Sequence, residues 1–405
     1  MHQGTDKMAR INNIPCRLAI GLLLFGLASA SWATTITVTS TSDSGAGSLR
    51  QAINDAVAGD TIEFDVPLPA VIALRSGFVL QKNLTIIGPG SDSLELSGTL
   101  MAGEDRTAIK VMTGTTLAIS GLAIEIMTDG ALFNLGATTV RYCTFTDNRN
   151  GNQGGAIYNE GTLVVGQSAF TRNKATDPNG GGAIFSKGPL TVENSTFADN
   201  TGLAGGAIWS DSAASISGST FTANQAGGLS AGVGGAILTR YGAMTIDNST
   251  FSGNSADAGG AISVVGPLTL TNSTFSDNHA TNGADAIANY NYIQISRTII
   301  SEACLNQGTV VSLGDNIAQS GACVPASAPL NDRNIDPLLL PLADNGGLTR
   351  TQALQSGSPA IDAVTVNDAA CSGTDQRGFA RPSGTHCDIG AFERDKDPIF
   401  ANGFD

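Results

Sequence analysis

The sequence is poor in charge, in aromatic side chains and in histidine. Charged residues make up 14% of the 405 positions and aromatic residues 5%, whereas charged residues alone reach roughly 25% in an average soluble protein. The 21 Lys and Arg against 35 Asp and Glu leave a net charge of −14, and no basic stripe is visible, so a nucleic-acid partner is not expected. His2 lies near the N-terminus, and His279 and His386 stand alone in the sequence without metal-ligand spacing.

Proline is scarce, with 14 residues, whereas glycine is abundant, with 50. Glycine does not recur at every third position, which excludes a collagen helix. The hydrophobic fraction of 41% excludes a disordered chain. The middle of the chain has no apolar residues at helical spacing, which excludes the helical and leucine-rich repeat classes.

The N-terminus has the pattern of an export signal over residues 1–33. Lys7, Arg10 and Arg17 precede the apolar residues 18–30, and small residues end the segment at Ser31 and Ala33. The apolar stretch is too short to cross a bilayer comfortably. An uncleaved anchor is the alternative to a cleaved signal peptide, and we expect export in either case.

Two motifs recur through the middle of the chain at intervals of 24–30 residues. F-x-x-N begins at Phe145, Phe170, Phe197, Phe221, Phe251 and Phe275, and G-G-A-I begins at Gly154, Gly181, Gly205, Gly234 and Gly259. An apolar pair such as Leu163/Val165 stands seven and five residues before each Phe. A period this regular predicts a solenoid over residues 34–303, with clear repeats at about 115–300.

The repeat unit predicts an all-β fold of the parallel β-helix type. Its apolar–polar–apolar triplets are typical of half-buried strands, and three short strands separated by Asn, Gly and Ser turns make one coil of about 24 residues. Stacked coils place equivalent residues above one another, so the Phe residues should fill the core. The asparagines should form a structural ladder: Asn148, Asn173, Asn200, Asn224, Asn254 and Asn278. The paired glycines suit a turn with positive φ.

Three asparagines, Asn194, Asn248 and Asn272, stand in N-S-T and match glycosylation sequons. Their fixed position before each strand favours turn geometry over glycan attachment.

Both ends of the β-helix are expected to be capped. Residues 48–57 form an amphipathic helix with Leu49, Ile53, Ala56 and Val57 on one face, placed just before the first strands. Residues 304–393 lose the repeat and form a C-terminal cap region. In an oxidising compartment its cysteines pair locally as two disulfides: Cys304 with Cys323, and Cys371 with Cys387. Cys143 is left as a small buried thiol.

The F-x-x-N and G-G-A-I motifs resemble the repeats of the polymorphic outer membrane proteins of chlamydiae and related bacterial β-helix proteins. Residues 47–52 (GSLRQA) are similar to the CSLREA segment of such proteins, with Gly47 in place of Cys and Gln51 in place of Glu. Four C-terminal strings are similar to the choice-of-anchor Q region: NGG at 345–347, SPAID at 358–362, DQRG at 375–378 and CDIGAFE at 387–393.

The resemblance implies a right-handed parallel β-helix, exported to the surface or outer membrane of a Gram-negative bacterium or secreted, with an adhesive role. The chlamydial proteins carry a C-terminal membrane barrel, for which the twelve residues after Glu393 leave no room. Residues 394–405 are interpreted as a sorting or anchoring tag, or as a last strand packed on the cap. A monomer is expected.

The main alternative is a carbohydrate-active β-helix enzyme, either a polysaccharide lyase or a glycoside hydrolase. Asp147, Asp199 and Asp277 precede the Asn of F-x-x-N and could bind calcium, but Arg172, Ala223 and Gly253 interrupt that column. Basic candidates are Arg172, Lys174, Lys187 and Arg240. Asp375, Arg377, Arg381 and Asp388 could form a charged cluster, for which an ion-paired network within the cap is the preferred interpretation. No catalytic residue, metal or cofactor is assigned, and calcium remains only a possibility for the acidic column.

The sequence favours a binding face over an active site. Two coils are longer than the others between F-x-x-N and G-G-A-I, over residues 174–180 and 225–233, and insertions in a solenoid emerge on one side, often the functional one. The candidate binding residues are Lys174, Thr176, Asp177, Asn179, Gln225 and Ser230. The expected partner is a glycan or a protein on a host or neighbouring cell surface. A passive structural rod is the third possibility.

Overall fold

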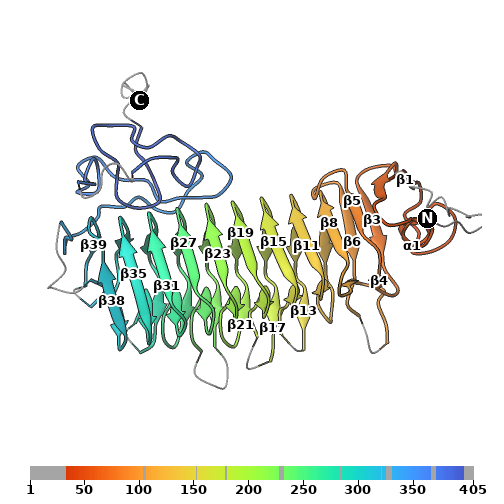
Figure 1. Ribbon diagram of the computed structural model, residues 1–405, viewed down its shortest axis with the longest axis horizontal. Helices are drawn as coiled ribbons and strands as arrows, with labels where there is room; N and C mark the ends of the chain where they lie inside the picture. The colour runs from red at the N-terminus through yellow and green to blue at the C-terminus, as the bar shows by residue number, and fades with distance from the viewer. Residues whose placement is uncertain are drawn as a thin grey trace, which may run out of the picture. The chain divides into compact units, whose positions relative to one another are not determined.

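The computed structural model describes residues 33–103, 106–151, 153–177, 180–227, 232–282, 284–320, 322–324, 331–365 and 371–395. Successive coils of the chain stack on one another and build three long parallel sheets, A, B and C (Figure 1). A fourth sheet, D, has six short strands. The prediction of an all-β parallel β-helix is therefore confirmed.

The strands of each sheet follow one another in stacking order. Sheet A contains β1 (Thr35–Val38), β2 (Thr61–Phe64), β5 (Leu84–Ile87), β8 (Thr116–Ser120), β11 (Ala137–Arg141), β15 (Thr162–Gly166), β19 (Leu190–Glu193), β23 (Ala214–Ser217), β27 (Met244–Asp247), β31 (Leu268–Thr271), β35 (Tyr292–Ser296) and β38 (Thr309–Ser312). Sheet B contains β3 (Ala70–Ala73), β6 (Leu94–Ser97), β9 (Ala123–Glu125), β12 (Thr144–Thr146), β16 (Ala169–Thr171), β20 (Thr196–Ala198), β24 (Thr220–Thr222), β28 (Thr250–Ser252), β32 (Thr274–Ser276), β36 (Ile299–Ile300) and β39 (Ile317–Ala318).

Sheet C contains β4 (Phe78–Leu80), β7 (Ile109–Val111), β10 (Leu132–Asn134), β14 (Ile157–Asn159), β18 (Ile184–Ser186), β22 (Ile208–Ser210), β26 (Ile237–Thr239), β30 (Ile262–Val264), β34 (Ile287–Asn289) and β37 (Leu305–Asn306). Sheet D contains β13 (Arg149–Asn150), β17 (Lys174–Ala175), β21 (Thr201–Gly202), β25 (Gln225–Ala226), β29 (Ser255–Ala256) and β33 (His279–Ala280).

The core is a set of stacked columns of identical side chains. The apolar pairs face inward from sheet A, as Leu190 and Val192 do in β19. The phenylalanines of F-x-x-N are fully buried in sheet B. Their rings stack at centroid distances of 4.6–4.9 Å with interplanar angles of 2–4°. In-register pairing of the coils therefore aligns the phenylalanine column that the repeat predicts.

The G-G-A-I glycines have two separate structural roles. Gly154, Gly205, Gly234 and Gly259 have φ between +64° and +76°, a conformation that disfavours residues with a Cβ. The second glycine of each pair lies against the next coil, since a Cβ on Gly206 would sit 2.0 Å from the carbonyl oxygen of Gly235.

An asparagine ladder runs along the turn after sheet B. In each rung, the backbone N and Nδ2 of one asparagine donate to Oδ1 of the next: Asn148 to Asn173, then to Asn200, Asn224, Asn254 and Asn278. All six side chains are buried. Each Nδ2 also donates to a carbonyl of the preceding coil, such as Asn173 to Phe145. The bonds between the asparagines all point toward the C-terminal coils, so the last pair of donors, on Asn278, needs an acceptor of another kind.

Glu302 supplies this acceptor. Its Oε1 accepts from the backbone N of Asn278 at 2.7 Å and from Nδ2 at 3.2 Å. A parallel ladder before sheet B runs through Ser168, Ser195, Ser219, Ser249 and Ser273 to Thr298 and Asn316. It ends on another carboxylate, because Oδ1 of Asp332 accepts from the backbone N and Nδ2 of Asn316.

Folding stability is expected to depend on pH through Glu302. Burial raises the pKa of Glu302 to about 7, against 4.5 for an unperturbed glutamate, although the two bonds from Asn278 lower it. The folded state thus binds the proton more tightly than the unfolded state. The stabilisation that Glu302 gains from its raised pKa is fully present below about pH 4.5 and is lost as the pH rises through about 7. Over this range the free energy of unfolding should fall by up to about 1.4 kcal/mol per pH unit.

The measurement is urea unfolding of the wild type and Glu302→Gln between pH 4.5 and 8. Glutamine keeps an acceptor for Asn278 but does not titrate, so the stability difference between the two proteins should change across this range. Asp388, whose pKa burial raises to about 6, is present in both proteins and serves as an internal control. Parallel stability profiles for the two proteins would contradict the assignment.

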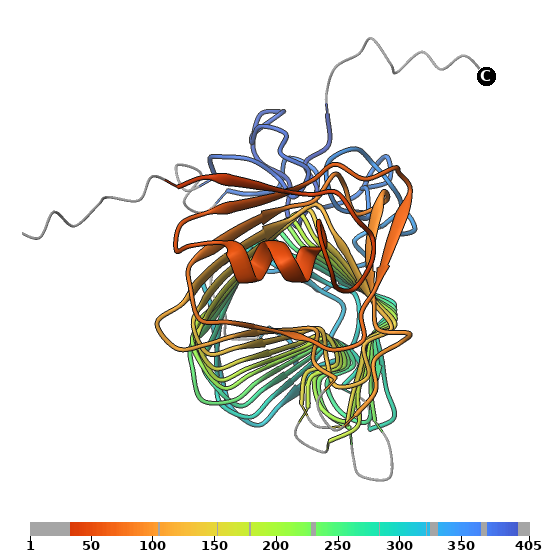
Figure 2. The same cartoon turned by 90° about the vertical axis from the view of Figure 1, so that its right-hand side faces the viewer.

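Helix α1 (Leu49–Asp55) lies across the N-terminal end of the coils (Figure 2). Ser48 caps it by accepting from the backbone N of Gln51 at 3.1 Å, and Leu49, Ala52 and Ile53 join the core. The expected amphipathic face differs in one residue, since Val57 follows the helix and is exposed. Strand β1 precedes the helix, where the sequence pattern indicated no strand.

The coils continue past residue 303, where the repeat ends in the sequence. Strand β38 pairs with β35 and β39 pairs with β36, although neither carries F-x-x-N or G-G-A-I. The expected disulfide between Cys304 and Cys323, with Cα atoms 5.0 Å apart, links the two ends of this last coil. Cys371 and Cys387 also pair as expected.

The C-terminal arm, residues 331–365 and 371–395, runs along the side of the coils (Figure 1). Sequence reasoning expected a cap at the end. The contacts instead extend over successive coils: Thr349 Oγ1 donates to the carbonyl of Gly218, Thr250 Oγ1 to Oε1 of Gln376, and the backbone N of Ala391 to Thr274 Oγ1. The threonines before the last three phenylalanines, Thr220, Thr250 and Thr274, therefore take part in docking the arm.

The described part of the chain contains no helix long and apolar enough to cross a membrane. Residues 1–32, which hold most of the expected signal peptide, and residues 396–405 of the expected tag lie outside the described residues.

Candidate functional site

The outer face of sheet C carries a column of aromatic side chains. Each three-residue strand buries its first and third side chains and turns its middle one outward. The middle residues of β10, β14, β18 and β22, paired in register, are Phe133, Tyr158, Phe185 and Trp209. In the repeat this is the residue directly after G-G-A-I, a signal that sequence reasoning missed.

The rings of this column stack along the direction of the coils. Phe133 and Tyr158 are 5.0 Å apart between centroids, Tyr158 and Phe185 5.4 Å, and Phe185 and Trp209 5.7 Å. Phe185 and Trp209 are nearly fully buried, and Val233, the last residue of the expected loop 225–233, packs against the same cluster. The column and that loop therefore belong to one surface.

Lys187 joins the aromatic column to a charged group. Its Nζ lies 2.6 Å from Tyr158 Oη and 3.1 Å from Oε1 of Glu160, and Tyr158 Oη donates to Glu160 at 2.7 Å. The hydrogen bond from Tyr158, followed by that from Lys187, lowers the pKa of Glu160. The bond to Tyr158 raises the pKa of Lys187. All three side chains are partly exposed, so this group can donate and accept hydrogen bonds with a ligand.

The predicted binding residues lie at the other end of the sheet C strands. Lys174 and Gln225 are exposed in strands β17 and β25 of sheet D, with β21 between them, so the two long loops are separated by one coil. Thr176 is exposed and contacts the carbonyl of Gly151 at 3.4 Å. Asp177 is half-buried, whereas Asn179 and Ser230 lie outside the described residues.

Sheet D also forms one side of a shallow hollow of about 440 Å³. Gln225, Ser255, Asp257 and His279 line it. His279 is not isolated as the sequence suggested, because its Nδ1 lies 3.4 Å from Oδ1 of Asp285.

The acidic column does not form a continuous site. Asp147, Asp199 and Asp277 have φ of +54° to +59° and occupy turn positions that Arg172, Ala223 and Gly253 share. Arg172 Nη2 lies 2.8 Å from Oδ2 of Asp147 in an exposed ion pair. Within the described ranges, no three His, Cys, Asp or Glu side chains are grouped as metal ligands.

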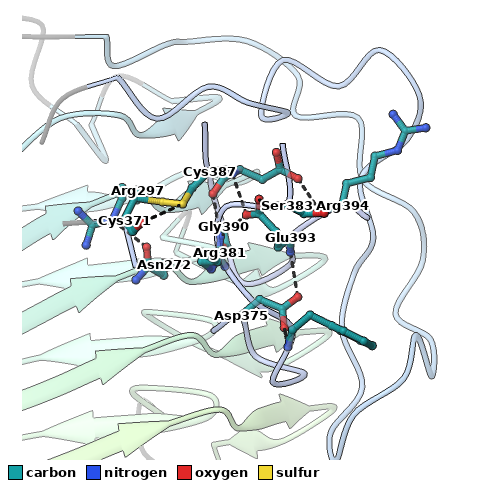
Figure 3. Close-up of polar contacts among 12 residues, drawn as sticks. Asn272, Arg297, Cys371, Asp375, Arg381, Ser383, Cys387, Gly390, Glu393 and Arg394 are labelled. Atoms are coloured by element: carbon teal, nitrogen blue, oxygen red, sulfur yellow. Dashed lines mark hydrogen bonds and ion pairs between the residues drawn. A yellow bond between two sulfur atoms is a disulfide. The ribbon is translucent and has the colours of Figure 1, made fainter. Parts of the chain in front are cut away.

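The C-terminal charged cluster is a buried network (Figure 3). Arg381 Nη1 lies 3.0 Å from Oε2 of Glu393, with both side chains at most 3% exposed. Arg377 Nη2 lies 2.7 Å from Oδ2 of Asp375. Asp388 accepts from the backbone N of Asp362 and of Arg394. The Arg381–Glu393 pair and the bond from Asp362 to Asp388 join separate segments of the arm, which is the role of an ion-paired structural network.

The N-S-T asparagines and Cys143 also have structural surroundings. Asn194, Asn248 and Asn272 have φ of +45° to +48°, the left-handed turn conformation that asparagine tolerates. Asn272 Oδ1 accepts from Nε of Arg297 at 2.8 Å. Cys143 is the free cysteine of the described residues, and burial raises the pKa of its thiol to about 11.

Comparisons with solved structures find two distant likenesses. The first is pectate lyase Pel9A, which is 15% identical with a TM-score of 0.44; the alignment covers 90% of this chain and 98% of the lyase. The second is a mutant of the PL6-family alginate lyase AlyGC, which is 12% identical with a TM-score of 0.34; the alignment covers 91% of this chain and 60% of that lyase. Likenesses this distant say nothing about activity. A search of curated proteins finds no match.

Family models match two parts of the chain. Residues 107–230 match the right handed beta helix region, and residues 248–265 match the Chlamydia polymorphic membrane protein repeat. The second match contains the F-x-x-N motif at Phe251 and the G-G-A-I motif at Gly259, two of the copies that suggested the resemblance. The chain is thus a right-handed parallel β-helix that carries a repeat of the chlamydial polymorphic membrane protein type.

Proposed function

We propose that this chain is an exported, surface-displayed β-helix protein that binds a glycan or a protein on a host or neighbouring cell, as an adhesin does. The observation that carries the proposal is the surface around sheet C. Exposed Lys174 and Gln225 lie where the chain enters this sheet, and the aromatic column with Lys187 lies on the sheet itself. A coil stack presents such side chains at fixed spacing, which suits an extended ligand.

The proposal is tested by retention of purified residues 34–405 on immobilised polysaccharides and on fixed cells. We expect retention without turnover. Release of new reducing ends, or of ultraviolet-absorbing unsaturated uronates, is followed in the same samples with and without calcium. Either product would overturn the proposal in favour of the lyase or hydrolase alternative, and the absence of both retention and turnover would leave a structural rod.

The contribution of the loops is tested separately. Shortening both long coils to the length of the coil between Phe197 and Ile208 preserves the registers of sheets B and C. We expect the shortened protein to keep its circular dichroism spectrum and to lose retention at least in part. Unchanged retention would exclude these loops as the binding surface.

A further inference from the structure

Four of the five tyrosines of the chain lie on sheet C, on the corner where the chain passes from sheet C to sheet A, or at the start of a sheet A strand. Tyr158 is in the aromatic column, and Tyr241, Tyr290 and Tyr292 follow β26 and β34. The last three are 67%, 40% and 36% exposed. Several partly exposed aromatic side chains on neighbouring coils form an apolar patch, which points to a binding role.

Coil stacking sets the spacing of these tyrosines. The first residues after sheet C are equivalent from coil to coil, since the backbone N atoms of Arg240, Val265 and Tyr290 each donate to the carbonyl of a sheet C residue one coil earlier. Val265, itself 40% exposed, therefore lies between the coils of Tyr241 and Tyr290. Arg240 and Tyr290 therefore occupy equivalent positions two coil steps, about 10 Å, apart, and Tyr241 follows Arg240 directly in the sequence. We call Arg240, Tyr241, Val265, Tyr290 and Tyr292 the tyrosine ridge.

Arg240 is the charged residue of this ridge. Its guanidinium carbon lies 5.5 Å from the ring centroid of Trp209 and 4.7 Å from that of Tyr241, so two rings hold it in place. Among the described residues, no carboxylate lies within ion-pair distance of it and no acceptor takes its hydrogen bonds. The nearest equivalent acid, Asp211 on the preceding coil, instead accepts from Nε1 of Trp209 at 2.6 Å.

An oriented guanidinium with unused donors suits a planar carboxylate, which it can bind with two parallel hydrogen bonds. An exposed tyrosine ring beside it suits the apolar C–H face of a sugar ring. A polymer of acidic sugars offers both groups in each residue and is extended enough to reach from Tyr241 to Tyr290. A neutral glycan would leave Arg240 unpaired.

We propose that the tyrosine ridge binds an acidic, uronate-containing polysaccharide, with one carboxylate on Arg240 and sugar rings on Tyr241 and Tyr290. This inference rests on the proposed glycan-binding function and assigns it a surface and a ligand class. The ridge follows the sheet C strands, whereas the two long loops precede them. Because Val233 and Arg240 both pack near Trp209, the ridge is tested with point variants that leave both loops intact.

The test measures retention of residues 34–405 on immobilised polygalacturonate and hyaluronate. Methyl-esterified polygalacturonate, which has the same backbone without the charge, is the control. We expect the wild type to be retained on at least one of the two acidic polymers and not on the ester, with retention weakening as salt rises. Arg240→Gln should weaken retention about tenfold, the effect of losing one charge-assisted contact. Tyr241→Ala should also weaken retention, because it removes the ring that would stack on the sugar and one of the two rings that hold Arg240.

Two variants serve as matched controls. Arg75→Gln removes an exposed arginine near the N-terminal end of the coils, and Tyr142→Ala removes a tyrosine that is 58% exposed outside the ridge. Both should be retained like the wild type, and all four variants should keep the wild-type unfolding midpoint.

The outcomes separate this inference from the function on which it rests. The assignment of the tyrosine ridge would be wrong if the wild type were retained only on the ester or only on cells, or if Arg240→Gln were retained as well as the wild type. The proposed binding function would remain in either case. Retention of the wild type on no glycan and no cell surface would overturn both.

Discussion

Phe221→Ala is expected to lower the free energy of unfolding by about 3–5 kcal/mol. Phe221 is fully buried, and its ring stacks on Phe197 at 4.9 Å and on Phe251 at 4.8 Å. Alanine would remove both stacking contacts and leave a cavity that the in-register coils cannot close, because each coil is held by its neighbours on both sides. Urea unfolding followed by circular dichroism measures the loss.

Two further variants define the cause. Phe221→Ile should cost less than alanine, because Ile124 and Ile300 occupy the same column at its two ends. Phe379→Ala removes a phenylalanine that is 50% exposed, where a contact with Arg377 is worth about 1 kcal/mol or less. An equal loss in Phe221→Ala and Phe379→Ala would contradict the interpretation.

Arg381→Met is expected to destabilise the C-terminal arm by about 3–5 kcal/mol. Arg381 pairs with Glu393 where both side chains are almost fully buried, and it also donates to the carbonyls of Asp388 and Gly390. Removing it leaves a buried carboxylate without its cation. The double variant with Glu393→Gln should lose less than the sum of the two single variants, since neither charge then remains.

The arm and the coils can be followed separately in this experiment. Limited proteolysis with mass spectrometry reports on residues 331–395, and circular dichroism reports mainly on the strands. We expect the arm to become sensitive to protease while the coils keep their unfolding midpoint. Arg172→Gln breaks the exposed pair with Asp147 and should cost about 0–1 kcal/mol. A loss of similar size in Arg172→Gln and Arg381→Met would exclude burial as the cause.

Most of the fold could be predicted because a solenoid repeats its local rules. In N-S-T-F, each residue has one role in every coil: Asn272 turns the chain with positive φ, Ser273 accepts in the serine ladder, Thr274 faces outward and Phe275 fills the core. A periodic sequence shows such roles several times over. The disulfide pairs could also be predicted, because cysteines close in sequence on loop-rich segments have few other partners.

Features that depend on distant residues could not be predicted. The C-terminal arm follows the side of the coils because Thr250 and Gln376, 126 residues apart, meet in a hydrogen bond. Glu302 ends the asparagine ladder although it belongs to no repeat motif, and Arg240 is held by Trp209 from the preceding coil. Thr250 and Gln376 follow no repeat spacing. Glu302 lies one coil from Asn278, 24 residues away, but stands outside both motifs, so the repeat pattern does not reveal its role.

The sequence by itself determined the β-helix, the register of its coils and the columns of phenylalanine and asparagine, because a period of about 24 residues places equal side chains one coil apart. Only the tertiary structure decided which outward residues form a surface. Whether Tyr241 and Tyr290 belong together, and whether Arg240 keeps unused donors, depends on how the strands wind around the axis and on which neighbours reach each side chain. Those contacts, rather than the repeat, locate the proposed binding site.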